Sequence, residues 1–401
     1  MGPGTTSTSS PLRQTLRIGT YVQVAGRDPD PFKPIIASTV LVRDDWNQTL
    51  SSIGVITRVV SPAPAMVFEA DGYLIRITPT TKLVFLDGIS SLADVSANTW
   101  LLFSGKLAKD GILEATKLQF MPAKPTKFKA VKNLEIATVK TRPVGASDAA
   151  TTSEASGTPA ITADGASLQQ DEQLKIGLGR WHTLPADQPL QQRVHRIGMA
   201  LVPAYQRVLT DDDPSKIHFR FFAVDNKKWR APYCLLDGAI LVSTQAIERL
   251  KNDDQLAAVL ASCVAYNLQR QAERQIVGNR VLEAQVAAEL TAAFVPVVGS
   301  AMELTVGLAA MKYGMDSYTM ALEQPRMSLA LMNDAGYDPW QAPEAWRLLA
   351  PSKLPANLAS LPYPDRSCYQ IDVLNMQYSS AKTAANGPTE VRQAGEDAER
   401  K

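Results

Sequence analysis

The sequence predicts an α+β protein of several domains, in which an N-terminal antiparallel β-barrel or sandwich precedes a mainly helical domain with a small sheet. Polar and apolar residues alternate with period two between about residues 14 and 130, as in half-buried strands. After about residue 188 the apolar residues recur at helical spacing. Between these regions, residues 141–172 are rich in small and polar residues, with hardly any large apolar side chain.

The composition is that of a globular protein without a strong charge bias. Hydrophobic residues make up 45% and charged residues 20% of the 401 residues, and the formal net charge is +1. A near-neutral chain creates no overall field that attracts nucleic acid or an anionic membrane, so we expect no nucleic-acid partner. The three cysteines, Cys234, Cys263 and Cys368, form no CxxC pair, and their odd number argues against a full disulfide framework.

The N-terminal strands are separated by turn-forming residues. Alternation is clearest in residues 55–60 and 73–78, and the dipeptides Asp71-Gly72 and Asp110-Gly111 favour turns. A weak internal repeat, in which a strand ends at glycine, turns and returns as a second strand, occurs in residues 19–42 and 98–120. This spacing resembles the OB-like β-domains of unknown function that recur in bacterial envelope proteins, and it suits a small barrel.

The changes in composition predict five segments. Residues 141–172 and the two ends of the chain cannot bury enough apolar surface to offset chain entropy. We expect a disordered N-terminus (1–13), the β-barrel or OB-like domain (14–135), a flexible linker (141–172), a second domain (173–378) and a disordered tail (379–401).

Neither a signal peptide nor a membrane span is visible. The first ten residues lack a basic region followed by an apolar one. The most apolar stretch, Thr291 to Met311, is interrupted by Pro296 and Glu303. A spanning helix needs about 20 mostly apolar residues, so we interpret this stretch as a buried helical hairpin.

The second domain is predicted to alternate helices with two short strands. Asp253 and Asp254 open one helix, because acidic side chains favour the positive end of the helix dipole. Gly336 and Pro339 form a glycine-then-proline stop. The predicted helices cover 188–209, 253–274 and 302–332, and the predicted strands cover 218–224 and 239–243.

Several motifs of this domain occur in a distinctive order. They are Val194–Leu201, Phe219–Asp225, Ala231–Ser243, Asn252–Ala261, and Glu323 followed by Ala335-Gly-Tyr-Asp-Pro339. Over about residues 190–375 this arrangement resembles the zinc metallopeptidase family of HtpX, the CAAX prenyl endopeptidases and periplasmic BepA. The resemblance implies a zincin-like domain, in which the helix that opens Asp-Glu-Leu-Ala continues into the zinc motif HExxH.

The residues that would bind zinc in this family are replaced. Two histidines at i and i+4 and the glutamate after the first bind the metal and activate water. Here the aligned residues are Ser262, Cys263 and Tyr266. At the spacing usual in the family, Ala321 stands at the third-ligand position, and the nearby carboxylate of Glu323 could serve only with a shifted helix. The replacements predict no catalytic residues and no metal.

Cys263 and the strand at residues 238–243 each have a possible functional interpretation. Cys263 is interpreted as a small apolar residue that fills an emptied site, or as a thiol nucleophile, which would need an activating group nearby. In the resembling family the strand at Gly238, Ala239, Ile240, Leu241, Val242 and Ser243 is an edge of the substrate cleft. An intact edge could bind an extended peptide by adding it as a strand.

These patterns favour a catalytically inactive peptidase homologue that acts in peptide or protein binding or in assembly. No cofactor is expected on this hypothesis, and its partner is a polypeptide. One alternative is an active zinc metalloendopeptidase with unusual ligands. The other is a self-associating structural protein of the envelope or surface. The resemblance places the chain in the bacterial envelope or outside the cell.

Overall fold

A computed structural model describes thirteen segments of the chain, from residue 22 to residue 378. The segments are 22–27, 36–42, 49–62, 66–108, 111–123, 139–143, 172–176, 181–183, 188–226, 229–235, 237–271, 317–350 and 365–378. The predicted disordered ends, 1–13 and 379–401, lie outside the described residues, as does the apolar stretch 291–311.

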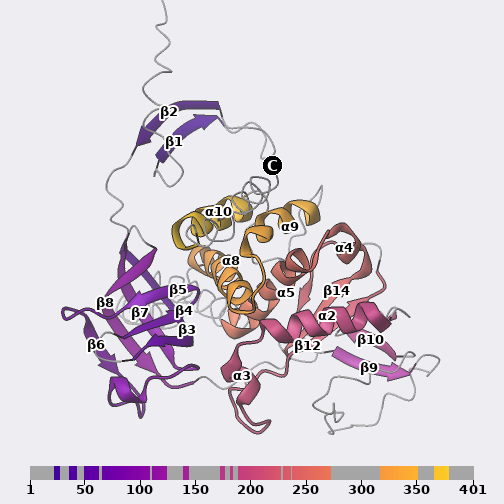
Figure 1. Cartoon of the computed structure of the whole chain (residues 1–401), viewed down its shortest axis with the longest axis horizontal. Helices are drawn as coiled ribbons and strands as arrows, with labels where there is room; N and C mark the ends of the chain where they lie inside the picture. The colour runs from indigo at the N-terminus through magenta and orange to yellow at the C-terminus, as the bar shows by residue number, and fades with distance from the viewer. Residues whose placement is uncertain are drawn as a thin grey trace, which may run out of the picture.

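The N-terminal region contains a closed five-stranded β-barrel (Figure 1). Its strands are β3 (Thr49–Ser61), β4 (Val67–Ala70), β5 (Tyr73–Arg76), β7 (Trp100–Leu107) and β8 (Ile112–Met121). The order β5-β4-β3-β7-β8 is antiparallel throughout, and β5 pairs with β8 in parallel to close the barrel. The predicted purely antiparallel pairing is therefore wrong at this seam. The short strand β6 (Lys82–Phe85) also pairs with β8 in parallel, and the 3-10 helix η1 (Leu92–Asp94) precedes β7.

Alternating side chains of the barrel strands face two different cores. On β7, Leu101 and Phe103 fill the barrel interior. Trp100, together with Ile53 and Val55 of β3, belongs to the core of the helical region. A strand with period-two side chains can serve two cores only when both of its faces are buried. The outer faces of β3 and β7 thus pack into the core of the helices, while the barrel interior forms a separate core.

Two further small sheets involve other predicted elements. The strands β1 (Val22–Arg27) and β2 (Ile36–Val42) form a two-stranded antiparallel sheet. The first copy of the internal repeat is therefore a hairpin that pairs with no barrel strand in the described segments. β9 (Val139–Pro143), β10 (Glu172–Ile176) and β11 (Trp181–Thr183) form another antiparallel sheet. The predicted linker is described only at its ends, which lie in β9 and β10.

The second region surrounds one buried helix. Its helices are α2 (Gln188–Leu201), α3 (Ala204–Val208), α4 (Thr244–Arg249), α5 (Asp253–Leu268), α8 (Ser317–Asp334), α9 (Ala342–Leu349) and α10 (Asp365–Gln377), with the 3-10 helix η4 (Pro339–Gln341). The sheet consists of β12 (Arg220–Val224), β14 (Ala239–Ser243) and β13 (Tyr233–Cys234). Nearly every side chain of α5 is buried, because α2, α8, α9 and the sheet pack around it (Figure 1).

Most of the predicted elements of this region are present, with shifted ends. The predicted helix 188–209 breaks at Pro203, which lacks an N–H to continue α2. α5 ends at Leu268, and Arg270 two residues later has a φ of 53°. The glycine stop is confirmed: Gly336 has a φ of 80°, and the Tyr337 N–H donates to the Met332 carbonyl at 2.9 Å.

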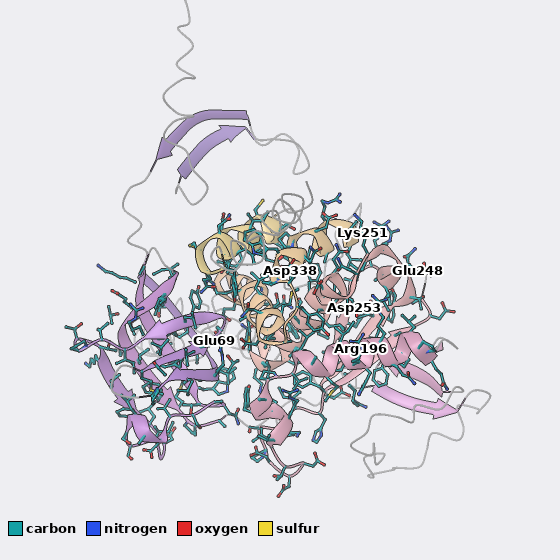
Figure 2. The ribbon with its side chains drawn as sticks, in the orientation of Figure 1. Glu69, Arg196, Glu248, Lys251, Asp253 and Asp338 are labelled. Atoms are coloured by element: carbon teal, nitrogen blue, oxygen red, sulfur yellow. A yellow bond between two sulfur atoms is a disulfide. The ribbon has the colours of Figure 1, made fainter. Side chains whose placement is uncertain are left out.

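The barrel and the helices meet through close backbone packing. Gly72, in the β4–β5 turn, has a φ of 71°, and a Cβ there would lie 2.8 Å from the backbone of Arg326 in α8. The Gln377 amide of α10 donates to the carbonyls of Gly72 and Gly111, each at 3.3 Å. Glu69 lies at this junction (Figure 2), where it bonds Arg58. Two turns of the barrel are thus anchored to the helices.

Within the described segments, no helix is long and apolar enough to cross a membrane.

Candidate functional site

The helix at the centre of the candidate site, α5, is fixed at its N-terminus. Asn252 caps it by accepting from the Gln255 N–H at 2.8 Å. Asp253, in the first turn, accepts from Arg193 and Arg196 of α2 at 2.7 and 3.0 Å. Figure 2 shows Asp253 and Arg196 close together at this end of the helix. The predicted acidic start is confirmed and bonds a neighbouring helix.

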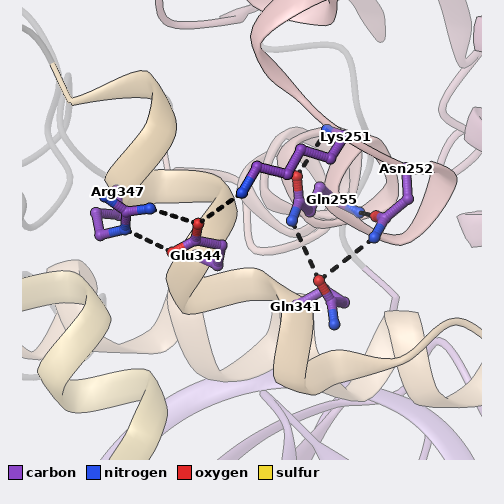
Figure 3. A network of polar contacts seen from close by, with 6 residues as sticks. All are labelled: Lys251, Asn252, Gln255, Gln341, Glu344 and Arg347. Atoms are coloured by element: carbon purple, nitrogen blue, oxygen red, sulfur yellow. Dashed lines mark hydrogen bonds and ion pairs between the residues drawn. The ribbon is translucent and has the colours of Figure 1, made fainter.

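A polar network connects the same helix end to α9 (Figure 3). The amide oxygen of Gln341 accepts from Gln255 at 3.1 Å and from Asn252 at 3.4 Å. Glu344 binds Arg347 in two short hydrogen bonds and lies 3.6 Å from the ammonium of Lys251. These contacts fix the angle at which α5 leaves the loop after α4.

Two sequence motifs that are far apart in the chain meet here. The Asp338 N–H, in the turn after α8, donates to the Asp254 carboxylate at 3.0 Å. Asp338 in turn caps η4 by accepting from the Trp340 N–H. The stop after α8 is therefore bonded directly to the start of α5, so the two helices that carry positions 262–266 and 321–324 are held side by side.

Cys263 forms a disulfide with Cys234. The bond joins the middle of α5 to β13 across 29 residues of sequence. Cys263 is fully buried, as expected for a residue that fills space. Both sequence interpretations are nevertheless corrected, because the sulfur is neither an unmodified apolar side chain nor a thiol available for attack. An odd number of cysteines does not exclude a single disulfide, and here the bond joins two of the three, Cys234 and Cys263.

Ser262 binds a buried arginine that the sequence did not indicate. The guanidinium of Arg366, from α10, donates to the Ser262 hydroxyl at 2.7 Å. It also lies 3.5 Å from the amide oxygen of Gln324 in α8. Gln324 donates to the Ser262 carbonyl at 2.8 Å. A single cation therefore connects Ser262 of α5 with Gln324 of α8.

An aromatic ring stacks on the guanidinium of Arg366. Its guanidinium carbon lies 3.8 Å from the ring centre of Trp346, a stacked cation–π contact. Desolvation lowers the pKa of Arg366 to about 9, which keeps it charged at neutral pH. No described carboxylate contacts it, so the charge is balanced only by dipoles and the π-face.

Tyr266, at the second-histidine position, is a protonated phenol. Burial raises the pKa of Tyr266 to about 12. A neutral phenol is a poor zinc ligand beside imidazole or thiolate. The phenol thus offers different chemistry from the histidine that the resemblance aligns with this position.

Glu323 faces the barrel. It is 2% exposed and accepts a 2.5 Å hydrogen bond from the Ser52 hydroxyl of β3. The adjacent Gln324, not Glu323, reaches α5. The carboxylate is thus hydrogen-bonded on the barrel side of α8, and only a shifted helix could bring it toward α5. Ala321 lies in α8, and its side chain is outside the described part of the structure.

The predicted cleft edge is the central strand of its sheet. β14 pairs in parallel with β12 over Ala239–Ser243 and antiparallel with β13 at Ile240 and Leu241. The Leu235 N–H donates to the Ala239 carbonyl and continues the β13 side. All five residues of β14 are buried. The residues 238–243 therefore do not present an open strand edge, because both neighbours already use it.

The two outer edges of this sheet are also protected. On β12, the Gln191 amide of α2 donates to the Phe221 carbonyl at 2.7 Å and accepts from the Ala223 N–H at 2.9 Å. On the other side, Pro232 precedes β13 and has no N–H to donate. The side-chain amide thus occupies the outer edge of β12, and the proline removes one backbone donor beside β13, two ways in which natural sheets protect their edges.

The residues at the aligned positions do not fit a zinc site. Zinc takes imidazole, thiolate or carboxylate, and here the positions hold a hydroxyl, a disulfide sulfur and a phenol. His195 lies on α2, where burial lowers its pKa, and His218 is exposed beside Asp211. In the described segments, no three His, Cys, Asp or Glu side chains are grouped closely enough to hold a metal ion.

Comparison with known proteins gave no relative: no protein-family model matches the chain, and a search of curated proteins returned no significant match.

Proposed function

We propose that this chain is a non-catalytic protein built on a zincin-like metallopeptidase scaffold, and that it acts in protein binding or assembly. One observation carries the proposal. The aligned first-ligand position, Ser262, binds the guanidinium of Arg366, a permanent cation that connects it to Gln324 of α8. A zinc ion beside that charge would be repelled, strongly so in a site of low dielectric constant.

The disulfide supports the same conclusion independently. Hydrolysis by the family mechanism needs a carboxylate at position 263 to take a proton from water. Cys263 has no titratable proton while it is bonded to Cys234. The disulfide joins α5 to β13, and Arg366 joins α5 to α8, the two helices that carry the aligned ligand positions.

The packing of the barrel against the helices supports a role in assembly. Its outer face on β3 and β7 packs into the helical core, and Gln377 joins two of its turns to α10. Partner binding by strand addition at the β12–β14–β13 sheet is not supported, because its edges are blocked. A partner would contact the side-chain surface of this combined unit.

The metal content of the purified protein tests the proposal. We expect less than about 0.1 zinc per chain after equilibration with zinc and desalting, and no casein cleavage that a chelator inhibits. Glu323→Gln serves as the matched control: its side chain faces Ser52, so the variant should leave both readouts unchanged. Stoichiometric zinc with chelator-sensitive cleavage that is lost in Glu323→Gln would establish the active metallopeptidase instead.

We propose that the protein resides in the bacterial envelope or outside the cell. Disulfides persist in oxidising compartments and are rare in the cytosol, and the Cys234–Cys263 bond favours such a location. Fractionation of cells expressing the native gene, with labelling of thiols at lysis, tests this. Protein recovered in the cytosol with both cysteines reduced would contradict it.

A further inference from the structure

Several buried polar atoms on and near Arg366 have no hydrogen-bond partner among the described residues. The Nε of Arg366 donates to no group of the described segments, and the residue is 2% exposed. Gln370 lies one helical turn further along α10, on the same face, and is fully buried. Both its amide nitrogen and its amide oxygen are unpartnered. The buried indole N–H of Trp346, whose ring stacks on the guanidinium, is also unpartnered.

These unpartnered atoms are mostly donors, and they belong to the cation itself, to a neighbour on its own helix and to the ring that stacks on it. The guanidinium, the amide and the indole contribute three donor nitrogen atoms, against one acceptor oxygen on Gln370. Buried polar groups are almost always satisfied, and an unpaired buried charge is strongly unfavourable. No described carboxylate contacts the guanidinium. An anion whose oxygens accept several N–H···O hydrogen bonds at once would satisfy these donors.

We propose that the protein binds one small oxyanion, of the carboxylate or phosphate class, between α5, α9 and α10, with Arg366 as the charged ligand and Gln370 and Trp346 as neutral donors. The free Nε of Arg366 and the neighbouring Nη2 form the side-on fork that matches two oxygens of such an anion. Ser262, which accepts from Nη2, keeps its own hydroxyl hydrogen available to donate. The Trp346 ring is partly exposed, so an anion would enter past it.

This inference does not depend on the proposed function. An oxyanion site requires only the charge and the donors, whether or not the protein also binds a partner. A zinc measurement that failed the proposed function would leave the oxyanion test open, because the two experiments have different readouts.

Thermal unfolding at constant ionic strength tests the site. The full-length protein is exchanged into buffer with sodium bromide, whose anion has no oxygen atoms, as the background, and sodium acetate, sodium phosphate or sodium chloride replaces it stepwise. We expect a saturable rise of about 2–4 °C at ten times the Kd for acetate or phosphate. Chloride should have a smaller effect, because it cannot engage the fork with two oxygens. Quenching or enhancement of Trp346 emission should saturate at the same concentration, and should be absent in Trp346→Phe.

Three variants make the test specific. Arg366→Met should abolish the anion dependence while the protein stays folded, since a buried ion replaced by an apolar side chain of similar size is tolerated. Gln370→Leu should raise the apparent Kd several-fold. Arg207→Met removes an exposed arginine of α3 and should behave as wild type. A wild-type midpoint that none of the three anions shifts would overturn the proposal, as would an equal shift in Arg366→Met.

Discussion

Removal of the Cys234–Cys263 disulfide should lower the stability of the helical region by a calculable amount. The bond closes a loop across a sequence separation of 29 residues. In the chain-entropy relation for crosslinks, such a loop restricts the unfolded chain by about 12 cal/mol/K, or about 3.6 kcal/mol at 25 °C. The double variant Cys234→Ala/Cys263→Ala should therefore lose at least this much, with a further loss from the removed volume at the buried Cys263.

Thermal unfolding followed by circular dichroism measures the effect. The loss corresponds to a fall in the midpoint on the order of 10 °C. Reduced wild type keeps both sulfur atoms, so its difference from oxidised wild type isolates the crosslink from the lost packing. Cys368→Ala, which changes an exposed cysteine of α10, is the control and should shift the midpoint by about 1 °C or less.

Two outcomes would refute this reasoning. One is an unchanged midpoint of wild type after reduction. The other is equal alkylation of the urea-unfolded protein with and without prior reduction. If the disulfide is present, reduction should expose two additional cysteines to the alkylating reagent.

Three further predictions follow from particular contacts. Gly72→Ala should destabilise the protein by about 1–3 kcal/mol more than Gly88→Ala, because both glycines have positive φ but only Gly72 lies against the backbone of Arg326; equal losses in urea unfolding would show that the barrel turn does not pack on α8. Gln191→Leu should leave the Phe221 carbonyl and the Ala223 N–H unsatisfied, at a cost of about 1–3 kcal/mol each, and should promote self-association at β12. Sedimentation measures that association, and Gln188→Ala, at an exposed position of the same helix, should remain as wild type. Burial and the charge of Glu69 raise the pKa of Asp334 from 3.8 to about 6, against the opposing effect of Arg58. Because the folded state holds this proton more tightly than the unfolded state, stability should fall as the pH rises from about 4 to about 6; in Asp334→Asn this fall should be smaller, whereas the exposed Asp225→Asn should show the wild-type pH profile.

Local periodicity predicted much of the secondary structure. The strand 239–243, the acidic start of α5 and the stop at Gly336 follow from signals that span a few residues. The apolar spacing predicts one helix as far as residue 209, because it continues past Pro203 into α3, whereas α2 ends at Leu201. Element ends depend on caps and turns, which carry a weaker signal than the repeating apolar positions inside an element.

The barrel shows which features of a sheet the alternation of residues can predict. Alternation located its strands, but the parallel β5–β8 pairing that closes it joins residues 74–76 to residues 112–114. Short turns between neighbouring strands indicate antiparallel hairpins, so the strand pattern predicts antiparallel pairing. The parallel seam depends on how the twisted sheet curls back on itself, which no local pattern records.

The sequence by itself determined which residues stand at positions 262, 263 and 266, and so excluded the histidines and the glutamate of the resembling family. Only the tertiary structure decided what those residues do. Arg366 reaches Ser262 across 104 residues of sequence, Cys234 bonds Cys263, and Gln191 closes the edge of β12. Each is a contact between side chains from separate elements, and its partner is selected by packing in three dimensions. Hydrophobic periodicity reports which face of an element is buried and carries no information about which polar group lies opposite.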